Sequence, residues 1–358
     1  MAGPERGEEV YGVSKNDAVD WEGERTLHHE DEQTGLRAVV AIHDTTLGPG
    51  LGGVRFAAYP TARAAAREAQ RLAEAMTWKN TLAGLPYGGA KAVITDTGGI
   101  TDRAALMAAF GRFTATLGGA YVPGVDLGTS TADLAVMART GATVSCATED
   151  PSPWTAMGVL AAVQAAARHV WGHGGLADRR VLVQGAGHVG SRLVRSLAAA
   201  GARVIVADTD ADRAVTLARE TGALCVPADR ALASACDIFV PCARARVLDE
   251  ATARTLTARI VAGAANDQLA DDTVVRILTA RHITYVPDFL ASAGGVIRIH
   301  AAEQGWDTAR TAAAIAGIGD RVTRVLDEGH RTGDPVTAAR DQARRILRSA
   351  ARPPGPLA

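Results

Sequence analysis

Short apolar runs alternate with longer amphipathic stretches along the chain, and this alternation predicts an α/β protein. In the N-terminal part, residues 36–42 and 91–94 form apolar runs that predict strands. The stretch from residue 60 to about residue 76 predicts a helix with Thr61 as its N-cap. Helical and strand patterns continue to about residue 146, and the segment Pro151-Ser152-Pro153 marks a boundary.

The pattern of apolar and polar residues changes after that boundary. An Ala-rich helix is predicted over residues 155–170, and a second helix over 191–200. The apolar runs that predict buried strands cover residues 181–184, 204–207, 238–240, 260–262 and 285–286. Buried strands joined by helices are typical of a doubly wound parallel sheet. The last stretch, from about residue 301, is helical and rich in Arg.

Length and charge narrow the class of protein. A chain of 358 residues favours two domains. The 38 basic and 39 acidic residues give a net charge of -1, which argues against a general nucleic-acid binder and a polybasic membrane anchor. We expect a cytoplasmic protein, because we find no long apolar stretch and residues 1–16 are polar. The four cysteines show no metal-type spacing, so no metal site is expected.

The basic residues are unusual in kind. Only Lys15, Lys79 and Lys91 are lysines, and the other 35 of the 38 are arginines. Arginine stays protonated, whereas a buried lysine can lose its proton near neutral pH. Lys79 and Lys91, which lie in the body of the chain with a glycine turn between them, are therefore candidates for chemistry that arginine cannot perform.

A glycine motif directly follows the strand at 181–184 and opens the next helix. Gly185 permits a tight turn, Gly187 lets the main chain approach a pyrophosphate, and Gly190 lets helix and strand pack closely. Asp208 ends the next strand and would accept hydrogen bonds from ribose hydroxyls while repelling a 2′-phosphate. The motif predicts an NAD site, with His188 and Val189 at the helix N-terminus beside the phosphates.

Several ordered motifs together resemble the glutamate/leucine/phenylalanine/valine dehydrogenases, most closely the leucine–valine–phenylalanine branch. The resemblance covers nearly the whole chain, and its motifs are 48–55 (GPGLGGVR), 76–80 (MTWKN), 85–91 (LPYGGAK), 125–129 (VDLGT), 151–156 (PSPWTA), the nucleotide motif, 263–269 (GAANDQL), 287–289 (PDF) and 293–296 (AGGV). It implies NAD-linked, reversible oxidative deamination of an L-amino acid to a 2-oxo acid and ammonia, by a homo-oligomer that binds only small molecules.

The resemblance also implies roles for individual residues. Lys79 would hold the substrate carboxylate, and Lys91 would be the general base for attack of water on the imine. We expect the pKa of Lys91 to be lowered by burial and by the charge of Lys79. Asp126 would exchange protons with the substrate amine. The remaining implied positions are Gly52 and Gly53 against the substrate, and Thr155, Ala243 and Asn266 against the cofactor.

The substrate side chain is expected to be apolar. Glutamate-specific relatives carry a Lys where this chain has Leu51, and a buried carboxylate without a partner is costly. Gly124 stands where leucine-preferring relatives tend to have Ala, which leaves room for a larger or aromatic side chain. The expected pocket wall is Leu51, Met76, Gly124, Val296 and Ile299, with Ser292 close by.

Four positions depart from the family pattern: Ala90 replaces Gly, Ser292 and Asp267 replace Asn, and Pro123 precedes the pocket residue Gly124. The stretch 142–150 is also short for the family. Two alternatives stay open: a relative acting on a modified amino acid or imine, and an NAD-binding protein without turnover.

The predicted domains are 1–149, an α/β substrate-binding and oligomerisation domain onto which 326–358 packs, and 150–325, a Rossmann-type NAD-binding domain.

Overall fold

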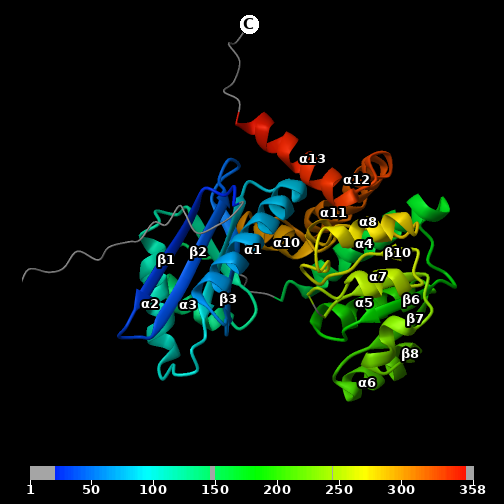
Figure 1. Cartoon of the computed structure of the whole chain (residues 1–358), viewed down its shortest axis with the longest axis horizontal. Coiled ribbons are helices and arrows are strands. Elements are labelled where there is room, and N and C mark those ends of the chain that lie inside the picture. The colour runs from blue at the N-terminus through cyan, green and yellow to red at the C-terminus, as the bar shows by residue number, and fades with distance from the viewer. Residues whose placement is uncertain (1–20, 146–149, 244, 352–358) are drawn as a thin grey trace, which may run out of the picture. The chain divides into compact units, whose positions relative to one another are not determined.

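The structure, a computed structural model, describes residues 21–145, 150–243 and 245–351 (Figure 1). The chain divides into two compact units. The first holds the described residues of Met1–Asn80 and Pro86–Thr148, and the second those of Thr81–Leu85 and Glu149–Ala358. The N-terminal segment 1–16 and Cys146, which entered the expectations above, lie outside the described residues.

A five-stranded mixed sheet forms the centre of the first unit. Its order is β1 (Arg25–Asp31), β2 (Leu36–Asp44), β4 (Gly88–Thr95), β3 (Gly50–Ala57) and β5 (Tyr121–Val125). β1 and β4 each pair antiparallel with β2, whereas β3 runs parallel to both β4 and β5. The polar edge strand β1 is partly exposed along its whole length, but β4 is buried from Gly88 to Ile94. The apolar run around Lys91 thus becomes a central strand.

Helices cover the two faces of this sheet differently. On one face, α1 (Ala62–Ala83) packs the small side chains of Ala65, Ala69 and Ala73 against β2 and β4. On the other face, α2 (Arg103–Ala115) and α3 (Thr131–Ala138) contribute larger side chains to the main apolar core. The small alanines of α1 let this helix approach the sheet closely, and the later turns of the helix carry Met76 and Lys79.

The second unit contains a six-stranded sheet in which every named pair is parallel. Its order is β11 (Thr284–Tyr285), β10 (Ile260–Val261), β9 (Ile238–Pro241), β6 (Arg180–Gln184), β7 (Arg203–Ala207) and β8 (Leu224–Cys225). With β6 counted as the first strand, this is the order 3-2-1-4-5-6 of the dinucleotide-binding fold. The predicted doubly wound α/β class is therefore confirmed.

The helices of the second unit connect and extend this sheet. The connecting helices are α4 (Ser152–Trp171), α5 (His188–Ala199), α6 (Ala211–Thr221), the 3-10 helix η1 (Ala228–Ala233), α7 (Glu250–Thr255), α8 (Thr273–Ala280) and α9 (Asp288–Ala291). The C-terminal helices are α10 (Gly294–Glu303), α11 (Thr308–Ala316), α12 (Ile318–Thr332) and α13 (Pro335–Ala350). Helix α12 packs on α4, and α13 packs on α12. The return of residues 326–358 to the first domain stays a prediction.

Most expected elements occur, and their ends differ by a few residues. Helix α1 continues to Ala83, and the expected cap Thr61 accepts a hydrogen bond from the backbone N–H of Ala64 (3.1 Å). Helix α5 begins at His188, three residues before the predicted start. The earlier start includes Gly190 in the helix, because helical geometry tolerates glycine when close packing requires it.

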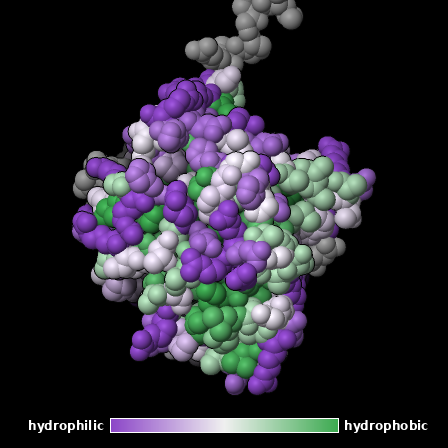
Figure 2. Space-filling view, turned by 90° about the vertical axis from the view of Figure 1, so that its right-hand side faces the viewer, coloured by the Kyte–Doolittle hydropathy of each residue, from purple (hydrophilic) through white to green (hydrophobic). Residues whose placement is uncertain are grey.

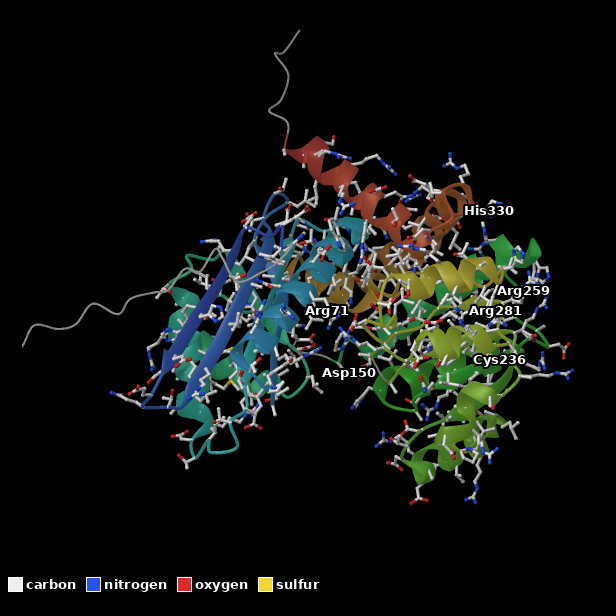
Figure 3. The ribbon with its side chains drawn as sticks, viewed as in Figure 1. Arg71, Asp150, Cys236, Arg259, Arg281 and His330 are labelled. Carbon is white, nitrogen blue, oxygen red and sulfur yellow. The ribbon has the colours of Figure 1, made fainter. Side chains whose placement is uncertain are left out.

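Two features of the described residues, the surface and the cysteine thiols, relate to the expectations from the sequence. No helix in the described ranges is long and apolar enough to cross a membrane, and hydrophilic residues cover much of the face in Figure 2. The described cysteines Cys225, Cys236 and Cys242 form no disulfide. Burial raises the pKa of Cys236, labelled in Figure 3, to about 11 and that of Cys242 to about 12, so both are neutral thiols.

Candidate active site

Lys91 lies buried in the middle of β4, between β2 and β3. Its Nζ lies 3.2 Å from Oδ2 of Asp126, which follows β5. Gly53 of β3 leaves the space between them, since a Cβ there would lie 3.2 Å from Nζ and 2.6 Å from the Cβ of Asp126. Only glycine at this position lets the ammonium and the carboxylate meet.

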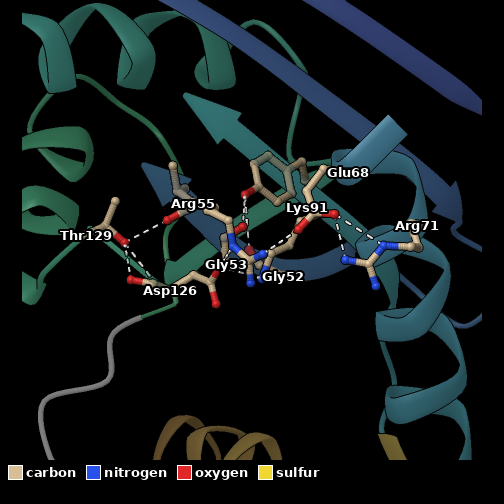
Figure 4. Close-up of polar contacts among 10 residues, drawn as sticks. Gly52, Gly53, Arg55, Glu68, Arg71, Lys91, Asp126 and Thr129 are labelled. Atoms are coloured by element: carbon tan, nitrogen blue, oxygen red, sulfur yellow. Dashed lines mark hydrogen bonds and ion pairs between the residues drawn. The ribbon is translucent and has the colours of Figure 1, made fainter. Parts of the chain in front are cut away.

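The turn that carries Asp126 is fixed to β3. Thr129 Oγ1 donates to the carbonyl of Val54 (2.7 Å) and accepts from the backbone N–H of Asp126 (3.0 Å). Gly128 has a φ of +78°, and a Cβ there would clash with the carbonyl oxygen of Phe56. The Asp-Leu-Gly-Thr motif is therefore a tight turn that presents the carboxylate to Lys91 (Figure 4).

Asp126 contacts two cations. Its Oδ2 accepts a hydrogen bond from Nε of Arg55 (2.8 Å) besides facing Lys91. Burial alone would raise the pKa of Asp126, but the charges of Lys91 and Arg55 and their hydrogen bonds lower it to about 2. The side chain is therefore an anion at neutral pH.

The pKa of Lys91 is lowered from its ordinary value. Burial is the largest cause, and it acts against the charge of Asp126, which raises the pKa. Arg55 lowers it further and is the cation with the largest effect, although from the sequence we attributed that effect to Lys79. A general base near neutral pH needs a pKa shifted in this direction.

Lys79 and Met76 lie near the end of α1, three residues apart and thus on one side of the helix. Lys79 is buried, and Met76 is half-buried against Gly52 of β3. The neighbouring Asn80 fixes this end of the helix, because its Nδ2 donates to the carbonyl of Gly88 (2.6 Å). Helix α1 therefore carries the buried Lys79 on the side of the sheet to which Lys91 belongs.

The glycine pair of β3 is held by a buried tyrosine. The hydroxyl of Tyr121 donates to the carbonyls of Gly52 (3.1 Å) and Gly53 (3.4 Å). A Cβ at Gly52 would clash with the carbonyl of Ala90, so the strands approach too closely there for any side chain. Gly124 pairs with Gly53 across β3 and β5, and a Cβ on it would meet only the Gly53 Cα, at 4.0 Å. Open space at Gly124 is consistent with a substrate side chain beside it.

The remaining predicted pocket residues lie in separate places. Leu51 is buried in β3 of the first unit. Val296 and Ile299 are half-buried on α10 of the second unit, three residues apart on one side of the helix. Ser292 is buried, and its hydroxyl donates to the carbonyl of Asp288 (2.7 Å). A single pocket that includes all of them stays a prediction.

The glycine loop of the second unit has the properties of a nucleotide cradle. Gly185 has a φ of +105°, and a Cβ on it would lie 2.8 Å from that of Ala243. A Cβ at Gly190 would clash with the carbonyl of Gly185, whereas a Cβ at Gly187 would meet nothing within 4 Å. Gly187 caps α5 without any side-chain hydrogen bond. The loop therefore leaves the N-terminus of α5, at His188, open to an anion.

Asp208 ends β7 beside this loop. One carboxylate oxygen accepts from the backbone N–H of Ala186 (2.6 Å), and the other accepts from that of Asp210 (2.8 Å). Nη1 of Arg213 lies 3.9 Å from Asp208 Oδ2. The residues present thus fit a dinucleotide: a glycine cradle, an open helix N-terminus, and a carboxylate fixed at the end of the next strand.

Thr155 and Asn266, the other predicted cofactor residues, also lie in the second unit. Thr155 stands in the first turn of α4, where its Oγ1 donates to the carbonyl of Pro151 (3.2 Å) and lies against Gly295. Asn266 is exposed, and its neighbour Asp267 faces Nε of Arg246 (3.3 Å), which offsets the charge that Asp267 introduces. Contact of Thr155 and Asn266 with a cofactor stays a prediction.

Two departures from the family pattern have structural explanations. The methyl group of Ala90 is completely buried against Gly50 rather than placed at the Lys91 amine. Pro123 fits within β5 because its carbonyl accepts from the backbone N–H of Ser145 (2.8 Å) and its missing N–H requires no partner.

The sequence alone indicated no role for Arg55 or Glu68. Arg55 Nη1 donates to Oε1 of Glu68 (2.6 Å), and its Nε donates to Asp126. A signal for Arg55 was present: it follows Gly53 by two residues, so both lie on one face of β3. Glu68 gave no comparable signal, because charged residues are common on surface helices.

Models of two protein families match the chain. The model described as Glu/Leu/Phe/Val dehydrogenase, dimerisation domain, matches residues 24–143, and the Glutamate/Leucine/Phenylalanine/Valine dehydrogenase model matches residues 210–302. The first match lies mainly in the first unit, and the second match lies within the second unit.

Individual relatives are similar over most of their length. Valine dehydrogenase of Streptomyces albus is 40% identical over 328 residues, which cover 89% of this chain and 90% of the relative. Leucine dehydrogenase of Bacillus subtilis is 36% identical over 325 residues, covering 89% of each. The crystal structure of L-tryptophan dehydrogenase from Nostoc punctiforme is similar with a TM-score of 0.79 at 32% identity, over 93% of this chain and 98% of that one.

Proposed function

The chain belongs to the Glu/Leu/Phe/Val dehydrogenase family, and from this premise we propose that it is an NAD-linked dehydrogenase of apolar L-amino acids. The reaction interconverts the amino acid with its 2-oxo acid and ammonia. The observation that carries the proposal is the buried Lys91 amine, 3.2 Å from the Asp126 carboxylate across a glycine. An amine of lowered pKa beside a fixed anion suits a reaction in which water must be deprotonated during attack on an imine.

Lys91 acts as the general base in this proposal. Bound NAD supplies the hydride acceptor for the substrate Cα. Neutral Lys91 takes a proton from the water whose oxygen bonds to the imine carbon, and it returns that proton to the nitrogen of the resulting carbinolamine. As the carbon–nitrogen bond breaks, the Lys91 amine takes the remaining hydroxyl proton, which leaves the 2-oxo acid and ammonia. The burial that lowers the pKa of Lys91 favours the neutral form of the amine.

Asp126 and Lys79 bind the two ends of the amino-acid backbone. The pKa of about 2 keeps Asp126 ionised, so it accepts hydrogen bonds from the substrate amine and transfers protons without retaining them. Lys79 binds the substrate carboxylate. Its place on α1 beside Met76 leaves the open space at Gly124 for the substrate side chain.

The substrate is an apolar amino acid, because Leu51 supplies no cation for a second carboxylate. We assign Gly124 and Met76 of the first unit to its side-chain pocket, and the role of Val296 and Ile299 stays a prediction from the sequence. The names of the relatives, valine and leucine dehydrogenases, support an apolar side chain.

We assign NAD to the glycine loop, with the pyrophosphate at the N-terminus of α5 and the ribose at Asp208. The fixed carboxylate of Asp208 disfavours a 2′-phosphate. A homo-oligomer is proposed as the working form, which the match to a dimerisation-domain model supports.

The test follows absorbance of the reduced cofactor with the purified chain, NAD and a panel of L-amino acids, then with 2-oxo acids and ammonium. We expect turnover with aliphatic or aromatic substrates and none with glutamate. Silence in both directions, while NAD binds, would contradict the proposal and favour the alternative of a binding protein. The matched variant Gly124→Ala should shift preference toward smaller side chains by about 10-fold or more.

A further inference from the structure

A chain of alternating charges continues outward from the Lys91–Asp126 pair (Figure 4). Arg55 Nε lies 2.8 Å from Asp126 Oδ2, and its Nη1 lies 2.6 Å from Oε1 of Glu68. The other oxygen of Glu68 then contacts Arg71 Nη2 at 2.6 Å. Three positive groups and two negative groups therefore alternate from the buried strand β4 to the outer part of α1.

The inner members of this chain are shielded from solvent. The side chains of Arg55, Asp126 and Glu68 are 17%, 16% and 21% exposed, and that of Lys91 is 7% exposed. Charges at such depth interact more strongly than surface pairs, because water screens them less. The planar guanidinium of Arg55 donates to both carboxylates from a rigid fork, which no lysine could reproduce.

We propose that Arg55 and Glu68 are positioning residues: Arg55 fixes the Asp126 carboxylate beside Lys91, Glu68 fixes Arg55, and the two opposed charges set the pH at which Lys91 becomes a free amine. The use of that amine as a base rests on the proposed function. The arrangement of charges does not.

The two residues act on Lys91 in opposite directions. After burial, the charge of Asp126 is the largest influence and raises the pKa of Lys91; Arg55 lowers it and Glu68 raises it. The positive charge of Arg55 therefore offsets the field of Asp126, and Glu68 limits that offset. Replacement of Arg55 by a neutral residue should raise the pKa, whereas the same change at Glu68 should lower it.

Other titratable groups border the site on every element around it. Tyr121 of β5 stays neutral, since burial raises its pKa well above the ordinary value. Burial also raises the pKa of Tyr59, which follows β3. Lys79 on α1 is also buried, and it is unchanged in the variants whose Lys91 titration is compared below.

The direct test uses the small number of lysines. With ¹³C at the ε carbon of lysine, the full-length chain gives three lysine signals, which Lys15→Arg and Lys79→Arg variants assign. Titration of the Lys91 signal in the wild type, Arg55→Gln and Glu68→Gln should give an upward shift for the first variant and a downward shift for the second. Arg112→Gln removes a 60% exposed guanidinium on α2 and should give no shift.

Opposite shifts are the result that a merely structural role would not produce. Loss of folding in Arg55→Gln would leave Glu68→Gln to decide. No shift in Glu68→Gln, or shifts of the same sign in both Gln variants, would overturn the proposal.

Kinetics separate this inference from the proposed function. In an active enzyme, kcat/KM rises from low pH as Lys91 loses its proton, and the pH of this rise should move with the Lys91 signal. The kcat/KM of Arg55→Gln should fall by up to about 100-fold at neutral pH. Opposite NMR shifts in a chain that turns over no amino acid would support the charge arrangement while the proposed function fails. Turnover with an unmoved Lys91 signal in both Gln variants would support the proposed function and overturn the inferred roles of Arg55 and Glu68.

Discussion

The two sites of this chain are built from different parts of the polypeptide. In the first unit, side chains from β3, β4, α1 and the turn after β5 come together as a series of ion pairs. In the second, residues 185–190 form a turn and the start of α5, where the absence of side chains at three glycines matters most. The lysine site therefore depends on charge and burial, and the nucleotide loop depends on main-chain geometry.

This difference indicates how each site should fail. A buried ion pair is sensitive to any change in charge, because the groups left behind keep their desolvation cost. A glycine cradle is insensitive to charge, but one added methyl group can block a ligand or a helix contact. Four predictions follow this contrast from the largest expected effect to the smallest.

Lys91→Arg should nearly abolish turnover. The variant keeps the positive charge but cannot lose its proton, so kcat should fall by about 10²–10⁴-fold, close to the fall in Lys91→Ala. Steady-state kinetics with the best substrate of the panel give the measurement, and Lys15→Arg serves as the control. An Arg variant with most of its turnover would exclude Lys91 as the base.

Gly187→Ala should separate cofactor binding from folding. A Cβ there meets nothing within 4 Å, so the melting temperature should not change, whereas the approach of a pyrophosphate is blocked. We expect NAD to bind about 10–100-fold more weakly by fluorescence titration. Gly190→Ala is the matched variant and should lower the melting temperature as well, because its Cβ clashes with Gly185. Unchanged NAD affinity in Gly187→Ala would contradict the assigned cradle.

Asp126 should contribute to stability in a defined pH range. Its pKa is lowered from 3.8 to about 2 in the folded chain, so its stabilising effect is complete above about pH 4 and is lost as the pH falls through the folded value. The contribution at neutral pH is about 2 kcal/mol. Urea unfolding of wild type and Asp126→Asn should show a gap that closes between about pH 4 and pH 2. A gap that stays constant over this range would argue against the ion pairs.

Asp208→Asn should have the smallest effect. The amide still accepts hydrogen bonds but no longer repels a phosphate, so the preference for NAD over NADP should fall by about 10-fold. Binding of both reduced cofactors gives the ratio. Asp210→Asn, which removes a neighbouring charge but keeps an oxygen that caps α6, should leave the ratio unchanged.

Local patterns predicted the second unit better than the first site. The glycine loop, the acid after the next strand and the parallel sheet all follow from neighbouring residues, and the structure has them at β6, α5 and β7. Lys91 was also identified from the sequence, because a scarce lysine inside an apolar run is unusual in a chain rich in Arg. The end of α1 at Ala83 was not, since tertiary packing extends helices beyond their amphipathic pattern.

The sequence by itself determined the family resemblance, the α/β class and the presence of an unusual lysine, because periodicity and motif spacing are properties of adjacent residues. Only the tertiary structure decided which charges surround that lysine. Arg55 lies 71 residues from Asp126 and 13 from Glu68 in the chain, yet it contacts both. A pKa depends on burial and on charges within a few ångströms, so the cation that lowers the pKa of Lys91 could be identified as Arg55 only after the strands were paired.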